Sequence, residues 1–382
     1  MGEFYGYRNQ KAETERIHRV ETLMTLDIPG YRLHNQFLAQ TNFTEPGQVV
    51  QRLGAVQSQD YAGGKWALAQ RLKNSTTDAA LDTAFNEGQI LRTHILRPTW
   101  HFVAPEDIRW MLALSGPRVH TANAFMYRQQ GLDESIIKRS YVVLEKVLRG
   151  NKHLTRTELG SAFAAAGIKN AESIRLGYFL MSAELDGIIC SGARKGIQFT
   201  YALLEERTPK VRAWTRDEAL AELSRRYFAT RGPATLHDFT WWSGLTMADA
   251  KQGIDAVKSE FISEETQGRT YWFDGSVSPV QEKSPTAHLL PNYDEYFIGF
   301  KDRSAIGAVI RPFERDANDP AFIAHIIIID GQIVGGWKRT LKKQAVILEL
   351  TLIPPLTKAQ ERAVAEAANR YGEFLQLPVE MA

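Results

Sequence analysis

The hydrophobic pattern along the chain predicts three helices followed by a two-stranded hairpin, and this order recurs three times. The middle copy is the clearest. Its first helix has one apolar face, made by Ile137, Tyr141, Leu144 and Leu148. Thr155 and Glu158 form a capping pair that starts the second helix, and a third helix ends at Gly187 before strand-like runs at 188–190 and 197–203. Three helices with a two-stranded wing are typical of a winged-helix unit.

Two further copies flank this one. The later copy runs from Thr215 to Phe273 and carries its own capping pairs, Thr215 with Glu218 and Thr246 with Asp249. Its Trp241 and Trp242 fall at helical spacing, so we expect both in the core. The first copy is looser and runs from Arg32 to Val103, with helices expected near 32–39, 47–56 and 77–87 and a wing over 90–103.

The pattern changes to strands after Pro279. The apolar run 322–329, the turn pair Asp330-Gly331 and the returning run 332–337 predict a tight hairpin, and 346–352 predicts another strand. A capping pair, Thr357 with Gln360, then starts an amphipathic helix. We therefore predict a small β-barrel or a curled sheet, closed by a helix.

The expected fold class is α+β, mainly α, with three tandem winged-helix units and a C-terminal small β-barrel with a closing helix. The predicted division is an N-terminal tail (1–25), winged helix 1 (26–130), winged helix 2 (131–210), winged helix 3 (211–280) and the β-barrel with its helix (281–382). A length of 382 residues suits two to four compact units.

Composition narrows the class of protein. With 44% hydrophobic and 24% charged residues the chain has the make-up of a globular protein. The net charge of +2 is too small for general attraction to nucleic acid, so a DNA-binding surface would need local clustering of cations. The single cysteine, Cys190, excludes an internal disulfide and fits a cytoplasmic protein. No apolar run is long enough to span a bilayer, so we expect no membrane partner.

Common catalytic signatures are missing from the sequence, including a phosphate-binding glycine loop, a nucleophile elbow and histidines paired at metal spacing. We expect neither a metal nor a cofactor. The segment that stands out is 53–60, where Gln57 and Gln59 are two residues apart and would point the same way in an extended chain. Taken alone, such a pair is more often a surface or helix-end feature.

Four blocks of the sequence resemble the winged-helix DNA glycosylases of the AlkZ and YcaQ type. They are 53–60 with 66–72, 92–103, 289–296 with 299–304, and 330–331 with 336–340. The resemblance implies three tandem winged helices around a concave DNA-binding face, a β-barrel near the C-terminus, and excision of N7-alkylated guanines, bulky and crosslinked ones included. The family's catalytic glutamine pair falls on Gln57 and Gln59, as in the AlkZ branch, while Ser58 departs from the aliphatic residue usual between them.

The chemistry of two glutamines suits such a substrate. An N7-alkylated guanine already carries a positive charge, so the base leaves without a strong general acid. Two amide carbonyls can position a water molecule and stabilise the oxocarbenium-like sugar. Because no lysine nucleophile is required, we expect a monofunctional, purely hydrolytic glycosylase.

Other residues are secondary candidates. Asp60 and His101 are possible auxiliary groups, although Asp60 equally suits a turn or helix end. Arg97 and His101, on the first wing, are expected to line the groove. A basic cluster is expected to contact DNA phosphates, unless it is only a solvated face: Lys338, Arg339, Lys342 and Lys343.

The expected partner is double-stranded DNA with alkylated bases, bound by a monomer. The alternative from another class is a non-enzymatic winged-helix DNA-binding protein, such as a transcriptional regulator, because a fold does not determine a function. An inactive relative that keeps the scaffold is a third possibility.

Overall fold

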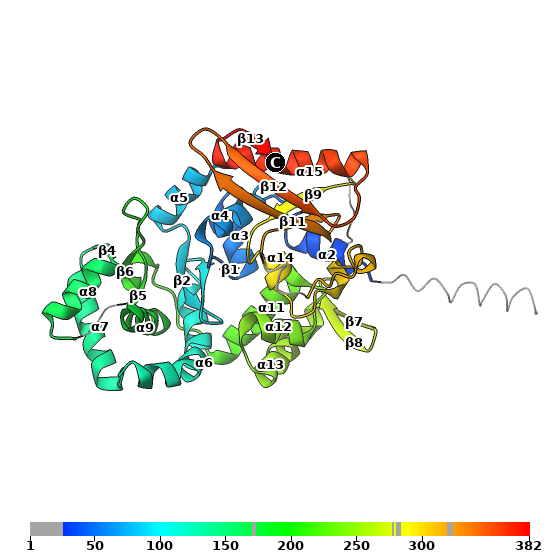
Figure 1. Ribbon diagram of the computed structural model, residues 1–382. Coiled ribbons are helices and arrows are strands. Elements are labelled where there is room, and N and C mark those ends of the chain that lie inside the picture. Colours follow the sequence, from blue (N-terminus) through cyan, green and yellow to red (C-terminus); the bar gives the residue numbers. More distant parts are fainter. Residues whose placement is uncertain (1–25, 170–172, 277–278, 280–283, 319–323) are drawn as a thin grey trace, which may run out of the picture.

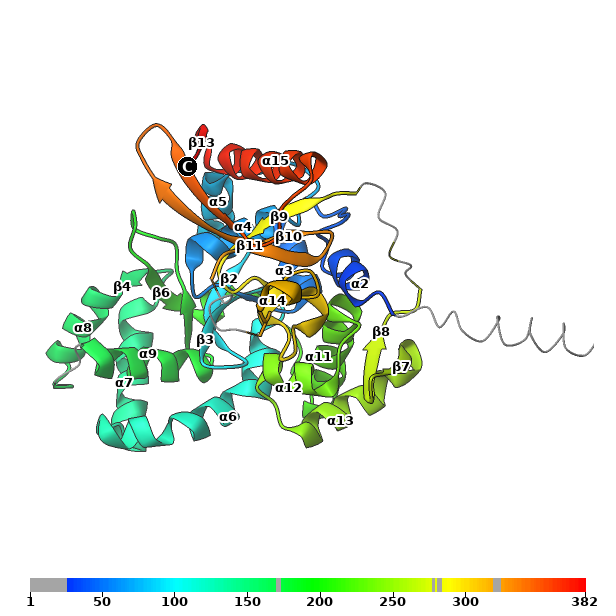
Figure 2. The same ribbon diagram turned by 45° about the vertical axis from the view of Figure 1, so that its right-hand side comes forward.

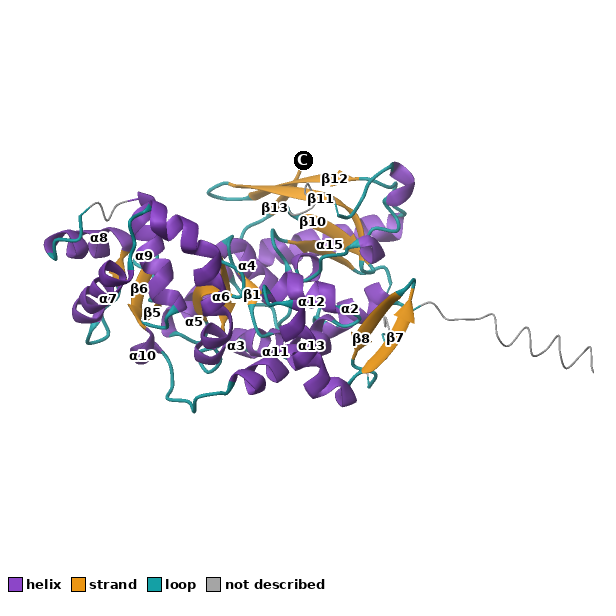
Figure 3. Ribbon diagram, turned by 90° about the horizontal axis from the view of Figure 1, so that it is seen from below, coloured by secondary structure: helices purple, strands orange, loops and turns teal. Residues whose placement is uncertain are grey.

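The computed structural model describes residues 26–382 except 170–172, 277–278, 280–283 and 319–323. The predicted N-terminal tail and the start of the predicted run 322–329 lie outside the described residues. The rest forms helices and four sheets, with the middle of the chain at one end of the molecule and the hairpin of 262–273 at the other (Figures 1 and 3).

The first segment builds a three-stranded sheet in the order β1-β3-β2. Its elements are α2 (Ile28–Asn35), α3 (Pro46–Leu53), β1 (Val56–Gln57), α4 (Tyr61–Ala69), α5 (Asp78–Glu87), β2 (Leu91–Ile95) and β3 (Thr99–Val103). The predicted helices and wing are present. The pattern missed α4, whose first turn carries Gly63 and Gly64, and the short strand β1.

A long helix that the pattern also missed, α6 (Ile108–Gln129), follows β3. It runs through Gly116-Pro117, a pair that normally ends a helix. Buried contacts on both sides of the proline, at Trp110, Met111 and Val119, maintain the helix. Packing therefore outweighs the local breaking signal here.

The middle segment has a core of its own. Its elements are α7 (Glu134–Leu148), β4 (Leu154–Thr155), α8 (Arg156–Ala165), α9 (Ser173–Leu185), β5 (Ile189–Ser191), β6 (Thr200–Leu203) and α10 (Leu204–Arg207). The buried apolar residues of this core lie between Tyr127 and Leu203. The capping box of Thr155 and Glu158 is confirmed, and Cys190 is buried. The predicted strand over 197–203 begins only at Thr200.

The third segment follows the predicted order. It consists of α11 (Arg216–Arg231), α12 (Leu236–Ser243), α13 (Met247–Val257), the 3-10 turn η1 (Lys258–Glu260), β7 (Ile262–Thr266) and β8 (Arg269–Phe273). Both predicted capping boxes are present. Trp242 is fully buried, as expected. Trp241 is 40% exposed, so its prediction as a core residue is wrong; it lies at the surface against α14 (Glu295–Ile298), where its indole N–H donates to the Ile298 carbonyl at 3.3 Å.

The C-terminal segment forms a curled five-stranded sheet in the order β13-β12-β11-β10-β9. Its elements are β9 (Ala287–Leu290), α14 (Glu295–Ile298), the 3-10 turns η2 (Ser304–Ile306) and η3 (Arg311–Phe313), β10 (Ile326–Ile329), β11 (Gln332–Leu341), β12 (Val346–Leu352), α15 (Lys358–Leu375) and β13 (Val379–Met381). Among the described strands, β13 and β9 remain edges, so of the two predicted forms the structure has the curled sheet and not the closed barrel. As predicted, a helix covers it: α15 lies along the sheet (Figure 2).

The first and last segments share one core. Val50, Leu53 and Trp66 from α3 and α4 pack in the same buried cluster as residues of β9, β11 and α15. Trp66 also donates from its indole N–H to the Leu289 carbonyl at 2.6 Å. The C-terminal sheet is therefore packed directly onto the segment that carries Gln57. The winged-helix assignment of the three helical segments stays a prediction.

Candidate functional site

The two glutamines lie at an edge of the first sheet. β1 pairs antiparallel with β3, so that Gln57 is opposite His101. The pairing continues one residue further, because the Ser58 N–H donates to the Trp100 carbonyl at 2.8 Å. Ser58 is buried beneath the strand, Gln57 is 5% exposed and Gln59 is exposed. The strand β1 ends at Gln57, its pairing with β3 continues through Ser58, and Gln59 lies in the bend that follows.

Both carboxamides are oriented through their oxygen atoms. Gln57 Oε1 accepts a hydrogen bond from Arg97 Nη2 at 3.2 Å, and Gln59 Oε1 accepts one from the Trp100 backbone N–H at 3.3 Å. A guanidinium and a backbone N–H can only donate, so these contacts determine which amide atom is the oxygen. Each carbonyl oxygen keeps a second lone pair for another donor.

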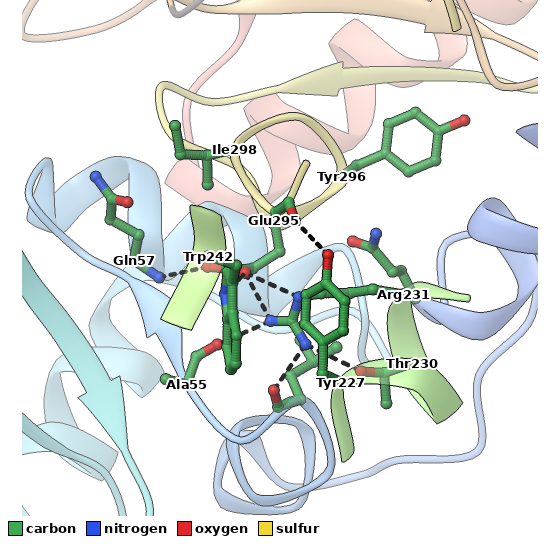
Figure 4. A network of polar contacts seen from close by, with 12 residues as sticks. Ala55, Gln57, Tyr227, Thr230, Arg231, Trp242, Glu295, Tyr296 and Ile298 are labelled. Atoms are coloured by element: carbon green, nitrogen blue, oxygen red, sulfur yellow. Dashed lines mark hydrogen bonds and ion pairs between the residues drawn. The ribbon is translucent and has the colours of Figure 1, made fainter. Parts of the chain in front are cut away.

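A buried ion pair holds the backbone of Gln57 (Figure 4). Glu295, on α14, accepts the Gln57 backbone N–H at 2.8 Å through Oε1. Its Oε2 atom accepts from Arg231 Nη2 at 2.6 Å and from the Trp242 indole N–H at 2.9 Å. Both charged side chains of the pair are fully buried. The side chain of Gln57 extends away from this network in Figure 4, which leaves the amide for other contacts.

Arg231 extends the same support to the segment before β1. Its Nη1 and Nη2 atoms donate to the carbonyls of Leu53 at 2.9 Å and Ala55 at 3.2 Å. The third segment and the C-terminal segment thus hold the strand that carries the glutamines. Sequence reasoning missed Glu295 and Arg231 as site residues. The available signal was an acidic pair, Asp294-Glu295, within an apolar and aromatic run.

Electrostatics keep Glu295 ionised and His101 neutral. Burial by itself raises the pKa of Glu295, but the charge of Arg231 and the hydrogen bonds from Arg231 and the Gln57 N–H bring that pKa below its ordinary value. Burial lowers the pKa of His101 to about 4. His101 Nδ1 lies 3.0 Å from the Thr99 carbonyl, which can only accept, so Nδ1 carries the proton and Nε2 is an acceptor. A neutral histidine of this kind is no proton donor to a leaving base.

The other residues that the sequence predicted for the site lie in different places. Arg97 reaches the site, where it contacts Gln57. Asp60 caps α4 by accepting the Gly63 N–H at 3.1 Å, and its carboxylate lies 3.6 Å from Arg339. Arg339 also donates to the Tyr371 hydroxyl at 2.5 Å. The three lysines of the cluster are exposed on the β11–β12 hairpin: Lys338, Lys342 and Lys343.

A cavity of about 450 Å³ lies beside the glutamine strand. Arg92, in its lining, donates to the Ser58 carbonyl at 3.1 and 3.2 Å, and its guanidinium stacks over Trp100 and Phe199 at 4.2 and 4.7 Å. Among the described residues, no three histidine, cysteine or acidic side chains gather as metal ligands, and no helix is long and apolar enough to cross a membrane.

Comparisons with known proteins agree on one family. A model of the family described as "DNA glycosylase AlkZ-like" matches residues 50–374. No curated protein sequence matches the chain. Among solved structures, the fold is similar to that of the Streptomyces sahachiroi DNA glycosylase AlkZ, with a TM-score of 0.73 and 19% identity over 93% of this chain and 98% of that one. Because the family model spans most of its length, the chain belongs to the AlkZ-like DNA glycosylase family.

Proposed function

We propose that the protein is a monofunctional DNA glycosylase that hydrolyses the N-glycosidic bond of cationic N7-alkylated purines in double-stranded DNA. Family membership supports DNA glycosylase activity in DNA repair. The observation that carries the finer assignment is the pair of oriented carboxamides, Gln57 and Gln59, at the edge of the first sheet.

The substrate class follows from which groups can titrate at the site. Glu295 is ionised and fully paired, and His101 is neutral, so neither supplies a proton to a departing base. This favours a base that leaves without protonation, and an N7-alkylated purine is such a base because it already carries a positive charge. The reaction hydrolyses the glycosidic bond: the water oxygen bonds to C1′, the electron pair of the broken bond stays on the base and neutralises it, and one proton of the water is released to solvent.

Each glutamine would contribute through its carbonyl oxygen. The second lone pair of each oxygen can accept an O–H of the attacking water or face the developing positive charge on the sugar. Arg97 and the Trp100 N–H act as positioning groups, because they prevent the amides from turning over. Asp60 and His101 are proposed only as supports of the α4 start and of β3, and no lysine nucleophile is invoked.

The DNA-binding surface is proposed to include Arg97 and the β11–β12 hairpin, with Lys338, Arg339, Lys342 and Lys343. The helical segments would act as tandem winged helices that hold the duplex, bound by a monomeric, cytoplasmic protein. Because Gln59 is exposed, bulky adducts and interstrand crosslinks need not fit an enclosed pocket, so we include them in the proposed substrate range.

Incubation with a duplex that contains one 7-methylguanine tests this function, with the released base measured by chromatography. We expect release without added metal or nucleotide, and unchanged release in EDTA. Undamaged duplex should lose no base. DNA binding without any release would contradict the proposal and favour the non-enzymatic alternative, a DNA-binding regulator.

A further inference from the structure

The wing of the middle segment ends in an exposed isoleucine. Between β5 and β6, the backbones of Lys195 and Gln198 exchange both hydrogen bonds, at 3.0 and 3.1 Å. Gly196, with φ +61°, and Ile197 form the two-residue turn between them. Ile197 is 88% exposed, and the loop that carries it projects from the body of the molecule (Figures 1 and 2). An apolar side chain is therefore held out in water at a tight turn.

Contacts with two helices brace this wing. Arg194 pairs with Asp82 at 3.0 Å, and its backbone N–H donates to Asn86 at 2.8 Å, so α5 holds one side. Lys195 pairs with Glu158 of α8 at 3.0 Å. Both of these cations beside the tip are thus paired with carboxylates. The tip therefore presents a preorganised apolar side chain to a ligand, rather than positive charge that would bind phosphates.

The tip also lies close to the candidate site. Ile197 and Trp100 both line the 450 Å³ cavity beside the glutamine strand. The Trp100 N–H holds the Gln59 carbonyl, and Arg92, in the same lining, holds the Ser58 carbonyl. This cavity therefore connects the exposed isoleucine with the residues that position Gln59.

We propose that Ile197 is a wedge that enters the base stack of duplex DNA next to the alkylated nucleotide. Apolar side chains inserted between base steps unstack and kink the duplex, and an enzyme that acts on a base must first expose it. A braced turn loses little conformational freedom on insertion, which favours this use of the tip. The inference rests on the proposed function, since it assigns the DNA-opening step of the same site.

Fluorescence of 2-aminopurine placed beside the lesion tests the wedge. The lesion is a 2′-fluoro 7-methylguanine, whose glycosidic bond resists hydrolysis because fluorine disfavours the oxocarbenium ion. At saturating wild-type protein we expect fluorescence to rise as the neighbour unstacks. Ile197→Ala should lose most of this rise, Ile197→Leu should keep it, and the matched control Val142→Ala, an exposed apolar residue (64%) on α7, should behave as wild type.

Salt dependence adds a second readout. Because Ile197 carries no charge, Ile197→Ala should leave the slope of log affinity against log salt unchanged. An equal rise in wild type and Ile197→Ala, or binding of wild type without any rise, would overturn the wedge. Neither result bears on base release, which is measured on the cleavable 7-methylguanine duplex; absence of release there contradicts the proposed function and leaves the fluorescence result valid.

Discussion

Single hydrogen bonds decide what the two glutamines present to a substrate. The guanidinium of Arg97 and the backbone of Trp100 turn each carbonyl oxygen toward the protein, with one lone pair left over. Each amide therefore acts as an oriented dipole and not as a titrating group. Under the proposed function, the loss of one positioned group should lower the rate of the chemical step more than it weakens binding.

Gln57→Ala and Gln59→Ala should each reduce the single-turnover rate of 7-methylguanine release by about 10²-fold. Binding to undamaged duplex should change little, because no charge is removed. Gln51→Ala, an exposed glutamine on α3, is the matched control and should keep the wild-type rate. Wild-type rates in both test variants, with circular dichroism showing the native fold, would contradict the catalytic assignment.

Glu295→Gln should destabilise the protein by about 3–5 kcal/mol, because it leaves the buried charge of Arg231 unpaired. Urea unfolding measures this free energy, and Glu106→Gln, at an exposed carboxylate, is the control. A change below about 1 kcal/mol would mean that the pair adds little to the folded state.

The same carboxylate predicts a pH dependence. Because the pKa of Glu295 is lower in the folded than in the unfolded chain, its contribution is full above the ordinary glutamate pKa of 4.5 and is lost as pH falls through the lowered value. Wild-type unfolding free energy should therefore fall more steeply below that pH than that of Glu295→Gln. If the unfolding free energies of the two proteins fall equally steeply in the acid range, this role of Glu295 is contradicted.

At the scale of elements, the β11–β12 hairpin divides the basic cluster into two kinds of residue. Side chains alternate across a strand, so Arg339 lies on the same face as buried Trp337, while Lys338 faces outward. Arg339 is engaged with Tyr371 and Asp60, and the lysines are exposed. The three lysines are therefore the better candidates for phosphate contacts.

Replacement of Lys338, Lys342 and Lys343 by alanine should lower the slope of log affinity against log salt by about 0.9 for each phosphate that is no longer neutralised, or about 2.7 in all. Affinity should fall alike for damaged and undamaged duplexes. An unchanged slope would place the DNA path elsewhere, toward the β2–β3 hairpin around Arg97; His101, which was expected to line the groove there, is fully buried. Arg339→Ala should instead lower stability, because it breaks the hydrogen bond between β11 and α15.

For the whole molecule, one buried core is local to the middle of the chain and another joins segments that are far apart in the sequence. The middle segment has a core drawn from residues 127–203, whereas α3 and α4 share theirs with the C-terminal sheet. Arg71 of the first segment also forms a buried bidentate pair with Asp294, at 2.7 and 2.9 Å. Asp294 and Glu295 thus connect the C-terminal segment to two earlier ones.

Fragments of the chain test this arrangement. We expect 131–210 to fold alone with one cooperative urea transition, because almost all of its core is its own. We expect 1–130 to lack such a transition, because it loses the C-terminal part of a shared core. A cooperative transition in 1–130 by circular dichroism would show that the first segment does not depend on the C-terminal sheet.

Local rules allowed the sequence to determine much of this protein. The capping boxes at Thr155, Thr215, Thr246 and Thr357 were predictable, because a cap needs only residues three apart. The family was also visible, in blocks of sequence. The sequence left open whether the C-terminal strands form a barrel or a curled sheet, because closure depends on how edge strands meet in space.

Only the tertiary structure decided how the glutamines are held. Glu295 and Arg231 lie far from Gln57 in the chain, and no spacing rule joins them. Tertiary structure likewise decided the exposure of Trp241, the continuation of the helix through Pro117 and the inward orientation of the Arg339 side chain. In each case burial against a distant segment sets the outcome, and burial is a property of the packed chain that neighbouring residues do not encode.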